Sequence, residues 1–207
     1  MKILFLGDSI TDMGRTYEND NVFMGNGHVF YIAGDLKRED PSIQIVNRGI
    51  SGNRVVDLYA RIKSDVWNLE PNILSILIGV NDVWHEINSK NGVDLERFTK
   101  VYDMLIEDTI KVLPNIKIIL CEPFVLKGSE TEENYNEFLK VKDYAKVVKR
   151  LAEKYNLEFL PLQEVLDSAA KKSQASDYLF DGVHPDVAGA RLIADEWMKL
   201  YNEKIKK

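Results

Sequence analysis

The sequence predicts an α/β protein built on a five-stranded parallel sheet with helices on both faces. Five short segments are almost entirely apolar, and they alternate with longer segments whose apolar residues recur every three or four positions. Short apolar strands are typical of parallel sheets that are buried on both faces. Strands that alternate with helices require right-handed crossover connections, which place helices on both sides of the sheet.

The predicted strands end in small or polar residues. They span residues 2–6, 43–47, 73–78, 116–120 and 157–160. Gly7 follows the first strand, Gly79 follows the third, and Glu122 and Pro123 close the fourth. We expect the doubly wound strand order 2-1-3-4-5, which brings the carboxyl ends of the first three strands together.

Helical periodicity marks residues 28–36, 54–69, 95–106, 135–151, 162–171 and 185–201. The second of these helices carries Val55, Leu58 and Ile62 on one face and stops before Pro71, and Pro185 suits the first position of the last helix. Residues 10–26 form a loop that is long for such a connection. Long loops in compact domains are often functional.

The composition is that of a single globular domain spanning residues 1–207. The chain has 27 Lys and Arg against 33 Asp and Glu, a net charge of −6, and no basic tract except the Lys-rich end, which argues against nucleic-acid binding. The single cysteine, Cys121, follows an apolar run, so we expect a buried thiol. No segment reaches the roughly 20 apolar residues of a membrane span and none resembles a signal peptide, so we expect a cytoplasmic protein.

The segment Gly7-Asp8-Ser9 places a hydroxyl at the carboxyl end of the first strand. In open α/β sheets, ligands bind at this edge. A tight turn followed by a helix N-cap explains the same three residues without any chemistry. The residues at the other strand ends are therefore needed to distinguish a catalytic serine from a simple turn and helix cap.

Polar residues at other strand and helix ends complete a candidate site for acyl transfer. His184 could act as the base for Ser9, and Asp181, three residues earlier, could orient His184. The N–H groups of Ser9 and Gly52 and the side chain of Asn81 could form an oxyanion hole. Each residue also has a purely structural interpretation, as a turn residue, a helix cap or a glycine with positive φ. For all of these interpretations to be right, such residues would have to occur by coincidence at four separate strand or helix ends.

The chain resembles the SGNH hydrolases, also called the GDSL esterase/lipase family. Four ordered blocks carry the resemblance: Gly7-Asp8-Ser9-Ile10, Gly49-Ile50-Ser51-Gly52, Gly79-Val80-Asn81-Asp82 and Asp181-Gly182-Val183-His184-Pro185. The resemblance implies a flavodoxin-like three-layer α/β/α sandwich and a serine esterase that needs no metal or other cofactor. It assigns Ser9 as nucleophile, His184 as base, Asp181 as its orienting acid, and Gly52 and Asn81 to the oxyanion hole.

Residues 47–54 and 78–84 are most similar to bacterial carbohydrate acetylesterases of the acetylxylan esterase type. This similarity implies a short-chain acetyl ester as substrate, on an acetylated sugar or xylo-oligosaccharide, and a protein that self-associates. We place Asp8, Arg54 and Trp84 in the substrate pocket. Trp84 has an equally good interpretation as a packing residue. His28 and His85 receive no role, although His85 follows Trp84 and could line the site.

Other functions remain open from sequence. A lysophospholipase or general arylesterase of the same family would differ in its preferred acyl chain. A metal-dependent phosphatase could use the carboxylates of Asp8, Asp12, Asp82 and Asp181 at the same sheet edge. A binding module could keep the fold without turnover, but the presence of all the candidate catalytic residues argues against it.

Overall fold

One parallel sheet of five strands forms the centre of the computed structural model, which describes residues 1–18 and 22–206. The strands are β1 (Lys2–Gly7), β2 (Gln44–Gly49), β3 (Ile73–Leu77), β4 (Lys117–Cys121) and β5 (Glu158–Leu160). Their order is β2-β1-β3-β4-β5, and every pairing is parallel. This confirms the predicted fold class and strand order.

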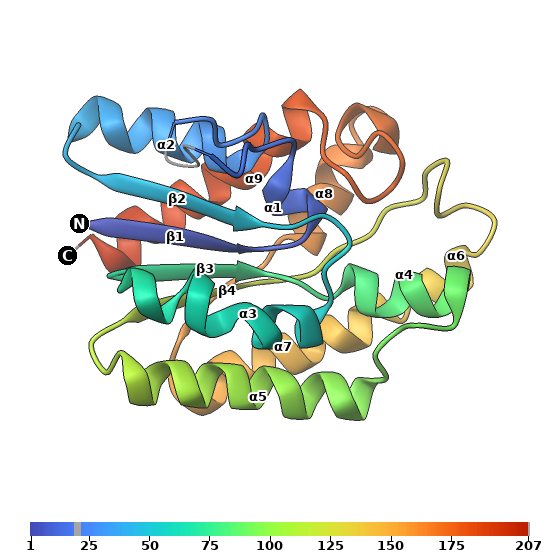
Figure 1. Cartoon of the computed structure of the whole chain (residues 1–207). Helices are drawn as coiled ribbons and strands as arrows, with labels where there is room; N and C mark the ends of the chain where they lie inside the picture. The colour runs from blue at the N-terminus through green and yellow to red at the C-terminus, as the bar shows by residue number, and fades with distance from the viewer. Residues whose placement is uncertain (19–21, 207) are drawn as a thin grey trace.

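The register of the central strands aligns their carboxyl ends. Gly7 at the end of β1 pairs with Gly49 on β2 and with Leu77 on β3. Leu77 pairs in turn with Cys121 on β4. The loops that follow these strands therefore begin at the same level, and both chain termini lie at the opposite end of the sheet (Figure 1).

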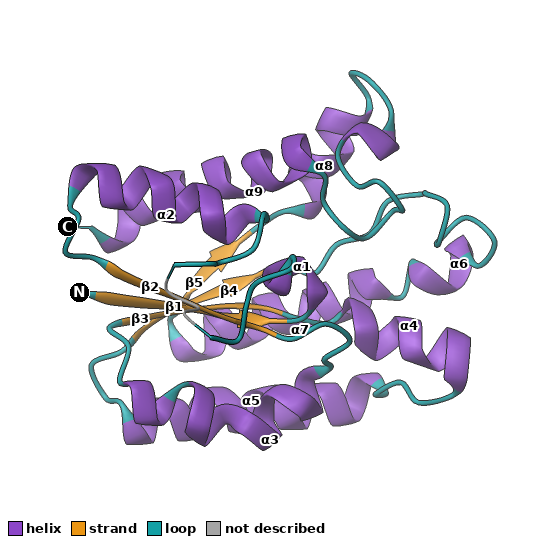
Figure 2. Ribbon diagram, turned by 45° about the horizontal axis from the view of Figure 1, so that its top comes forward, coloured by secondary structure: helices purple, strands orange, loops and turns teal. Residues whose placement is uncertain are grey.

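Helices cover both faces of the sheet (Figures 1 and 2). One layer contains α2 (His28–Glu39) and α9 (Val187–Leu200), which pack against each other, with α8 (Gln163–Ala170) on the same side. The opposite layer contains α3 (Val55–Asp65), α5 (Leu95–Val112) and α7 (Val141–Tyr155). This is the expected three-layer α/β/α sandwich.

The strands are buried because helices cover them on both sides. Residues 3–6 of β1 are at most 1% exposed. The Phe5 ring lies 5.3 Å from the ring of Trp197 on α9. Ser75 on β3 accepts a hydrogen bond of 3.1 Å from the Trp197 indole N–H and contacts the Cys121 thiol at 3.4 Å. Cys121 is buried, as the sequence predicts.

Four elements differ from the sequence prediction. Ser9–Asp12 form the short helix α1 within the predicted loop 10–26, of which residues 19–21 lie outside the described residues. Val80–Ser89 form a helix, α4, that periodicity did not indicate. The predicted helix 54–69 ends at Asp65 and is followed by the 3₁₀ turn η1 (Trp67–Leu69). The predicted helix 135–151 is divided into α6 (Tyr135–Phe138) and α7.

Local hydrogen bonds explain the break between α6 and α7 and, in addition, a later start of the last helix. Between α6 and α7, the amides of Lys140 and Lys142 bond to carbonyls three residues earlier, a tight turn that interrupts the α-helix. The last helix begins at Val187 and not at Pro185 because the Asp186 side chain caps it by accepting from Gly189 N–H at 2.9 Å. Pro185 lies in a β-bridge with Leu179. After α9 the chain continues into a short π-helix, Tyr201–Ile205.

Among the helices of residues 1–18 and 22–206, none combines the length and the apolar character needed to cross a membrane.

Candidate active site

Ser9 is the first residue of α1, and only Asp8 separates it from the carboxyl end of β1. Asp8 caps this helix, since its Oδ1 accepts from Ile10 N–H at 3.0 Å. Position 7 has no room for a side chain, because a Cβ there would lie 2.3 Å from Thr11 Oγ1 and 2.6 Å from the Leu77 carbonyl oxygen. The backbone thus turns sharply from strand to helix and holds the Ser9 hydroxyl at the sheet edge.

A hairpin-like loop before α9 brings His184 to Ser9. His184 Nε2 lies 2.7 Å from Ser9 Oγ, and His184 Nδ1 lies 2.6 Å from Asp181 Oδ2. The second carboxylate oxygen, Asp181 Oδ1, accepts from the backbone N–H groups of Val183 at 2.8 Å and His184 at 2.7 Å. Gly182 turns this loop at φ +99°, a conformation that favours glycine. Serine, histidine and aspartate therefore form one continuous hydrogen-bonded chain.

The aspartate and histidine perturb each other's protonation. Burial opposes the charged form of Asp181, but hydrogen bonds from the His184 side chain and from two backbone N–H groups outweigh it and lower the pKa of Asp181. The hydrogen bond to Asp181 raises the pKa of His184 above its ordinary value, against the opposing effect of burial. An imidazole made more basic in this way is a better proton acceptor for a serine hydroxyl.

Gly52 and Asn81, the predicted oxyanion-hole residues, both lie at the Ile50–Asn53 turn. Gly52 has φ +81° within a turn closed by a 3.1 Å bond from Asn53 N–H to the Ile50 carbonyl. This is the positive φ that the third residue of a type II turn requires. Asn81 is buried at the start of α4, and its Nδ2 donates to the Asn53 carbonyl at 3.1 Å. An amide NH₂ has two donor hydrogens, so a second one is left for an oxyanion.

Aromatic rings flank the histidine. The Trp84 ring centroid on α4 lies 5.9 Å from that of His184, and the Phe180 ring stacks on His184 at 5.7 Å and 18°. Trp84 also contacts Phe138 at 5.7 Å, edge to face. Trp84 therefore lies beside His184 and also packs against Phe138, and its placement in the substrate pocket stays a prediction. Sequence reasoning did not single out Phe180, although its place directly before Asp181 was a usable signal.

Two of the predicted pocket residues, Asp8 and Arg54, are held by hydrogen bonds to neighbouring residues. Asp8 is 0% exposed, and burial raises its pKa to about 7. Arg54 is held by Asp57, whose Oδ2 accepts from Arg54 Nε at 2.9 Å, and by the Asn91 carbonyl, which accepts from Nη1 at 2.6 Å. The Arg54 guanidinium thus stabilises the start of α3 and the loop that contains Asn91, and the placement of Asp8 and Arg54 in the substrate pocket stays a prediction.

The remaining histidines have different environments. His28 is 3% exposed at the start of α2, and burial lowers its pKa to about 4, so it is a neutral core residue. His85 is half-buried, and its Cε1 is 3.9 Å from the position that a Cβ on Gly52 would take. His85 therefore lies beside the Gly52 turn.

The four carboxylates considered for a metal site are engaged elsewhere. Asp8 caps α1 and Asp181 binds the His184 loop. Asp12 Oδ2 accepts two hydrogen bonds from Ser51, and Asp82 accepts from Val55 N–H. Within the part of the chain that the structure describes, no three His, Cys, Asp or Glu side chains gather as metal ligands.

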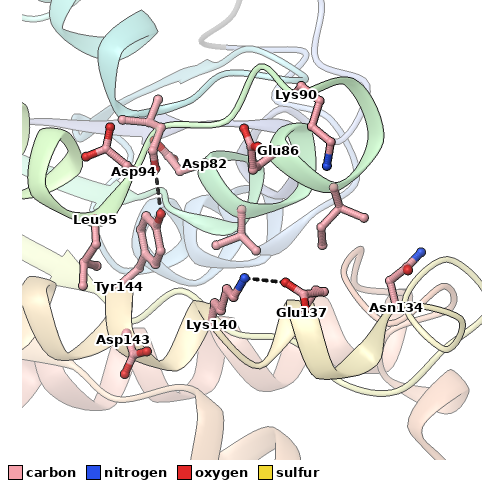
Figure 3. A pocket seen from close by; sticks show the side chains of 13 residues that line it. Asp82, Glu86, Lys90, Asp94, Leu95, Asn134, Glu137, Lys140, Asp143 and Tyr144 are labelled. Atoms are coloured by element: carbon pink, nitrogen blue, oxygen red, sulfur yellow. Dashed lines mark hydrogen bonds and ion pairs between the residues drawn. The ribbon is translucent and has the colours of Figure 1, made fainter.

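A separate cleft of about 580 Å³ opens between α4 and the α6–α7 segment (Figure 3). Its lining includes the apolar side chains of Val83 and Ile87, the charged Lys90, and the ion pair between Glu137 and Lys140. None of Ser9, Asp181 and His184 lines it. The cleft is therefore distinct from the serine–histidine–aspartate chain.

A hydrogen-bonded serine, histidine and aspartate at the carboxyl edge of a parallel α/β sheet is the arrangement of a serine hydrolase. The model of the GDSL-like lipase/acylhydrolase family matches residues 5–192. The chain belongs to this family and is a carboxylic ester hydrolase.

Known proteins resemble the chain over nearly its whole length. An acetylxylan esterase from Geobacillus stearothermophilus is 35% identical over 207 residues, covering 96% of this chain and 92% of the relative. The crystal structure of Axe2, an acetylxylan esterase from Geobacillus stearothermophilus, has a TM-score of 0.84 at 34% identity, covering 96% of this chain and 92% of that one. A protein from Parabacteroides merdae described as a GDSL-like lipase has a TM-score of 0.91 at 37% identity, covering 98% of this chain and 96% of that one.

Proposed function

We propose that the protein is a serine esterase that removes acetyl groups from acetylated sugars or xylo-oligosaccharides. The observation that carries this proposal is the continuous chain from Ser9 Oγ through His184 to Asp181, with bonds of 2.7 and 2.6 Å. Those distances suit a nucleophile, its general base and the group that orients the base.

In the proposed mechanism, Ser9 Oγ attacks the ester carbonyl carbon while His184 Nε2 takes the serine proton. The tetrahedral intermediate carries its negative charge on the former carbonyl oxygen. When that intermediate collapses, His184 returns the proton to the departing sugar oxygen and acetyl-Ser9 remains. A water molecule then attacks acetyl-Ser9 while His184 takes its proton, and His184 returns that proton to Ser9 Oγ as acetic acid leaves.

The oxyanion would be stabilised by the N–H groups of Ser9 and Gly52 and by Asn81 Nδ2. Ser9 is the first residue of α1, so its N–H needs no partner within that helix. Donors that are fixed before the reaction stabilise the charge that develops in the transition state without further reorganisation.

An acetylated carbohydrate is the substrate favoured by similarity. The curated relative at 35% identity is an acetylxylan esterase, and the chain covers 92% of it. Three of the similar crystal structures are of catalytic mutants of Axe2, an acetylxylan esterase from the same organism, in which an aspartate, a serine or a histidine is replaced by alanine. The Trp84 and Phe180 rings beside His184 offer flat apolar faces on which a sugar ring could rest.

Hydrolysis of 4-nitrophenyl acetate by wild type and Ser9→Ala, with and without a chelator, tests this proposal. We expect chelator-resistant activity that falls by about 10⁶ in turnover in Ser9→Ala, because removing the nucleophile of a triad removes its covalent chemistry. Activity that survives Ser9→Ala and disappears with chelator would contradict it and favour the metal-dependent alternative.

A series of 4-nitrophenyl esters separates the acetylesterase from the lysophospholipase or arylesterase alternatives. We expect turnover to fall steeply beyond short acyl chains. A maximum near eight carbons would overturn the assignment to acetyl esters and leave the serine mechanism in place. Release of acetate from acetylated xylo-oligosaccharides then tests the sugar itself.

A further inference from the structure

Two buried carboxylates hold the turn that carries Gly52, one from each side. Asp12 Oδ2 accepts from Ser51 N–H at 3.0 Å and from the Ser51 hydroxyl at 2.9 Å. The Asp82 carboxylate accepts from Val55 N–H, with its oxygens at 3.1 and 3.3 Å. Asp12 is 7% exposed and Asp82 is 1% exposed. Ser51 precedes Gly52 directly, and Val55 follows it by three residues, so the two anchors flank the turn.

Each carboxylate comes from the element that carries another proposed oxyanion donor. Asp12 lies three residues after Ser9 on α1, and Asp82 directly follows Asn81 on α4. Asn81 adds a third contact to the turn through Asn53. The three segments that would surround the oxyanion are thus linked to one another by hydrogen bonds from buried side chains.

We propose that Asp12 and Asp82 are positioning residues that fix the Gly52 N–H relative to Ser9 and Asn81. The proposal rests on the proposed esterase function. A catalytic donor has to be held to within roughly 0.5 Å of its productive position, and neighbouring hydrogen bonds normally provide that support. Gly52 has no side chain with which to lock its own peptide, so its position depends on the residues on either side.

The acceptor role does not depend on the charge of Asp82. Burial raises the pKa of this carboxyl to about 8, and both its ionised and its neutral form keep an oxygen that can accept from Val55 N–H. An asparagine keeps such an oxygen too, and its carbonyl has two lone pairs for the two Ser51 donors at position 12. Asparagine is therefore the conservative replacement at both positions, and alanine is the disruptive one.

Steady-state kinetics on 4-nitrophenyl acetate with Asp12→Ala, Asp12→Asn, Asp82→Ala and Asp82→Asn tests the proposal. We expect the alanine variants to lose about 10- to 100-fold in kcat with KM within about twofold, somewhat less than the loss of a whole oxyanion donor. The asparagine variants should recover most of the lost kcat. A rise in KM at constant kcat, or no recovery with asparagine, would overturn the proposal.

Matched controls separate positioning from general stability. Asp40 accepts from Ser42 N–H at 2.9 Å and from the Ser42 hydroxyl at 2.7 Å, the same pair of bonds that Asp12 makes, but before β2. Asp94 caps α5 by accepting from Arg97 N–H at 2.9 Å. We expect Asp40→Ala and Asp94→Ala to keep wild-type kcat. Comparable losses of kcat in these controls would contradict a specific role for Asp12 and Asp82.

Active-site titration from the acyl-enzyme burst corrects each kcat for unfolded protein, and a thermal melt records the stability of each variant. If the loss in Asp82→Ala disappears after this correction, the residue is only structural. A double-mutant cycle with Asn81→Ala gives a second reading. Combined losses smaller than the product of the single losses support action through a shared set of donors, and losses that multiply contradict it.

The same experiments distinguish the two proposals. An inactive Ser9→Ala together with an unaffected Asp82→Ala would overturn only the positioning role. An active Ser9→Ala would overturn the serine mechanism on which that role rests.

Discussion

His184 determines the pH dependence expected of the enzyme at low pH. Its hydrogen bond to Asp181 raises the pKa of the imidazole above the ordinary value of 6.5. Only the neutral imidazole can take the Ser9 proton, so kcat/KM should fall as pH decreases through a midpoint above 6.5. In Asp181→Asn we expect this midpoint to move down and turnover to fall on the order of 10⁴, as measured in a pH–rate profile.

Asp8 provides the control for that profile. The pKa of this buried carboxyl is raised to about 7, and its charge contributes to the raised pKa of His184. Asp8→Asn should therefore shift the midpoint down but keep the acid limb, because His184 still titrates. Loss of the acid limb in Asp8→Asn would assign the profile to Asp8 instead of His184.

Asn81 should contribute to the transition state and little to substrate binding. Its Nδ2 already donates to the Asn53 carbonyl, which fixes the orientation of the amide before substrate arrives. We expect Asn81→Ala to lower kcat for 4-nitrophenyl acetate by about 10²–10³ with little change in KM, the usual cost of one oxyanion donor. A loss confined to KM would indicate that Asn81 binds the ground state.

At the scale of elements, the contact between α1 and β2 fixes where Ser9 stands. A Cβ on Gly49, at the end of β2, would lie 2.2 Å from Asp12 N and 2.6 Å from the Thr11 carbonyl carbon. Both are backbone atoms of α1, so the clash cannot be relieved by a side-chain rotation. Gly49→Ala should lower the free energy of unfolding by about 1–3 kcal/mol, measured by urea denaturation, and should also reduce kcat as α1 shifts.

Gly34→Ala is the matched control for that substitution. Gly34 is exposed within α2, and a Cβ there meets nothing within 4 Å. Alanine is favoured over glycine in a helix interior by up to about 1 kcal/mol, so this variant should be slightly more stable and fully active. A loss of stability at both glycines would show that the close approach of α1 and β2 is not the cause.

The elements also show what could be predicted from sequence. The strands were predictable because a buried parallel strand is apolar throughout, as residues 3–6 of β1 are. The helix α4 was missed because its first turn buries the polar Asn81 and Asp82 together with Val80 and Val83, so apolar spacing does not mark it in sequence. The break after Phe138 was missed because the apolar spacing continues across it, while the interruption depends on backbone bonds.

Residues of the candidate site could be predicted where they lie next to the end of a predicted strand or helix. Contacts that depend on how distant segments pack could not be predicted. Ser9 begins α1 after β1, and Asp181 and His184 lie in the loop before α9, and hydrogen bonds join the three as the sequence predicts. The contact that holds Arg54 could not be anticipated, because nothing in its own segment indicates that Asn91, from a distant loop, would bind its guanidinium. The role proposed for Asp12 could not be anticipated for the same reason, since its partner Ser51 is 39 positions away.

At the scale of the whole molecule, the packing of both helical layers on the sheet encloses Cys121. The thiol is 4% exposed at the end of β4, and burial raises its pKa to about 12. A thiol reagent reacts with the thiolate, so the native protein should be almost inert and should react only when the structure opens. The rate of labelling by Ellman's reagent then measures the equilibrium for that opening.

If Cys121 becomes accessible only on global unfolding, its labelling rate should follow overall stability even for changes made far away. Each 1.4 kcal/mol is a factor of ten in an equilibrium constant, so Gly49→Ala should label about 5- to 150-fold faster than wild type. Gly34→Ala should label up to about fivefold more slowly. In denaturant all three proteins should react at one thiol and at one rate. Equal native rates in the three proteins would instead indicate a local opening at the end of β4, independent of the contact between α1 and β2.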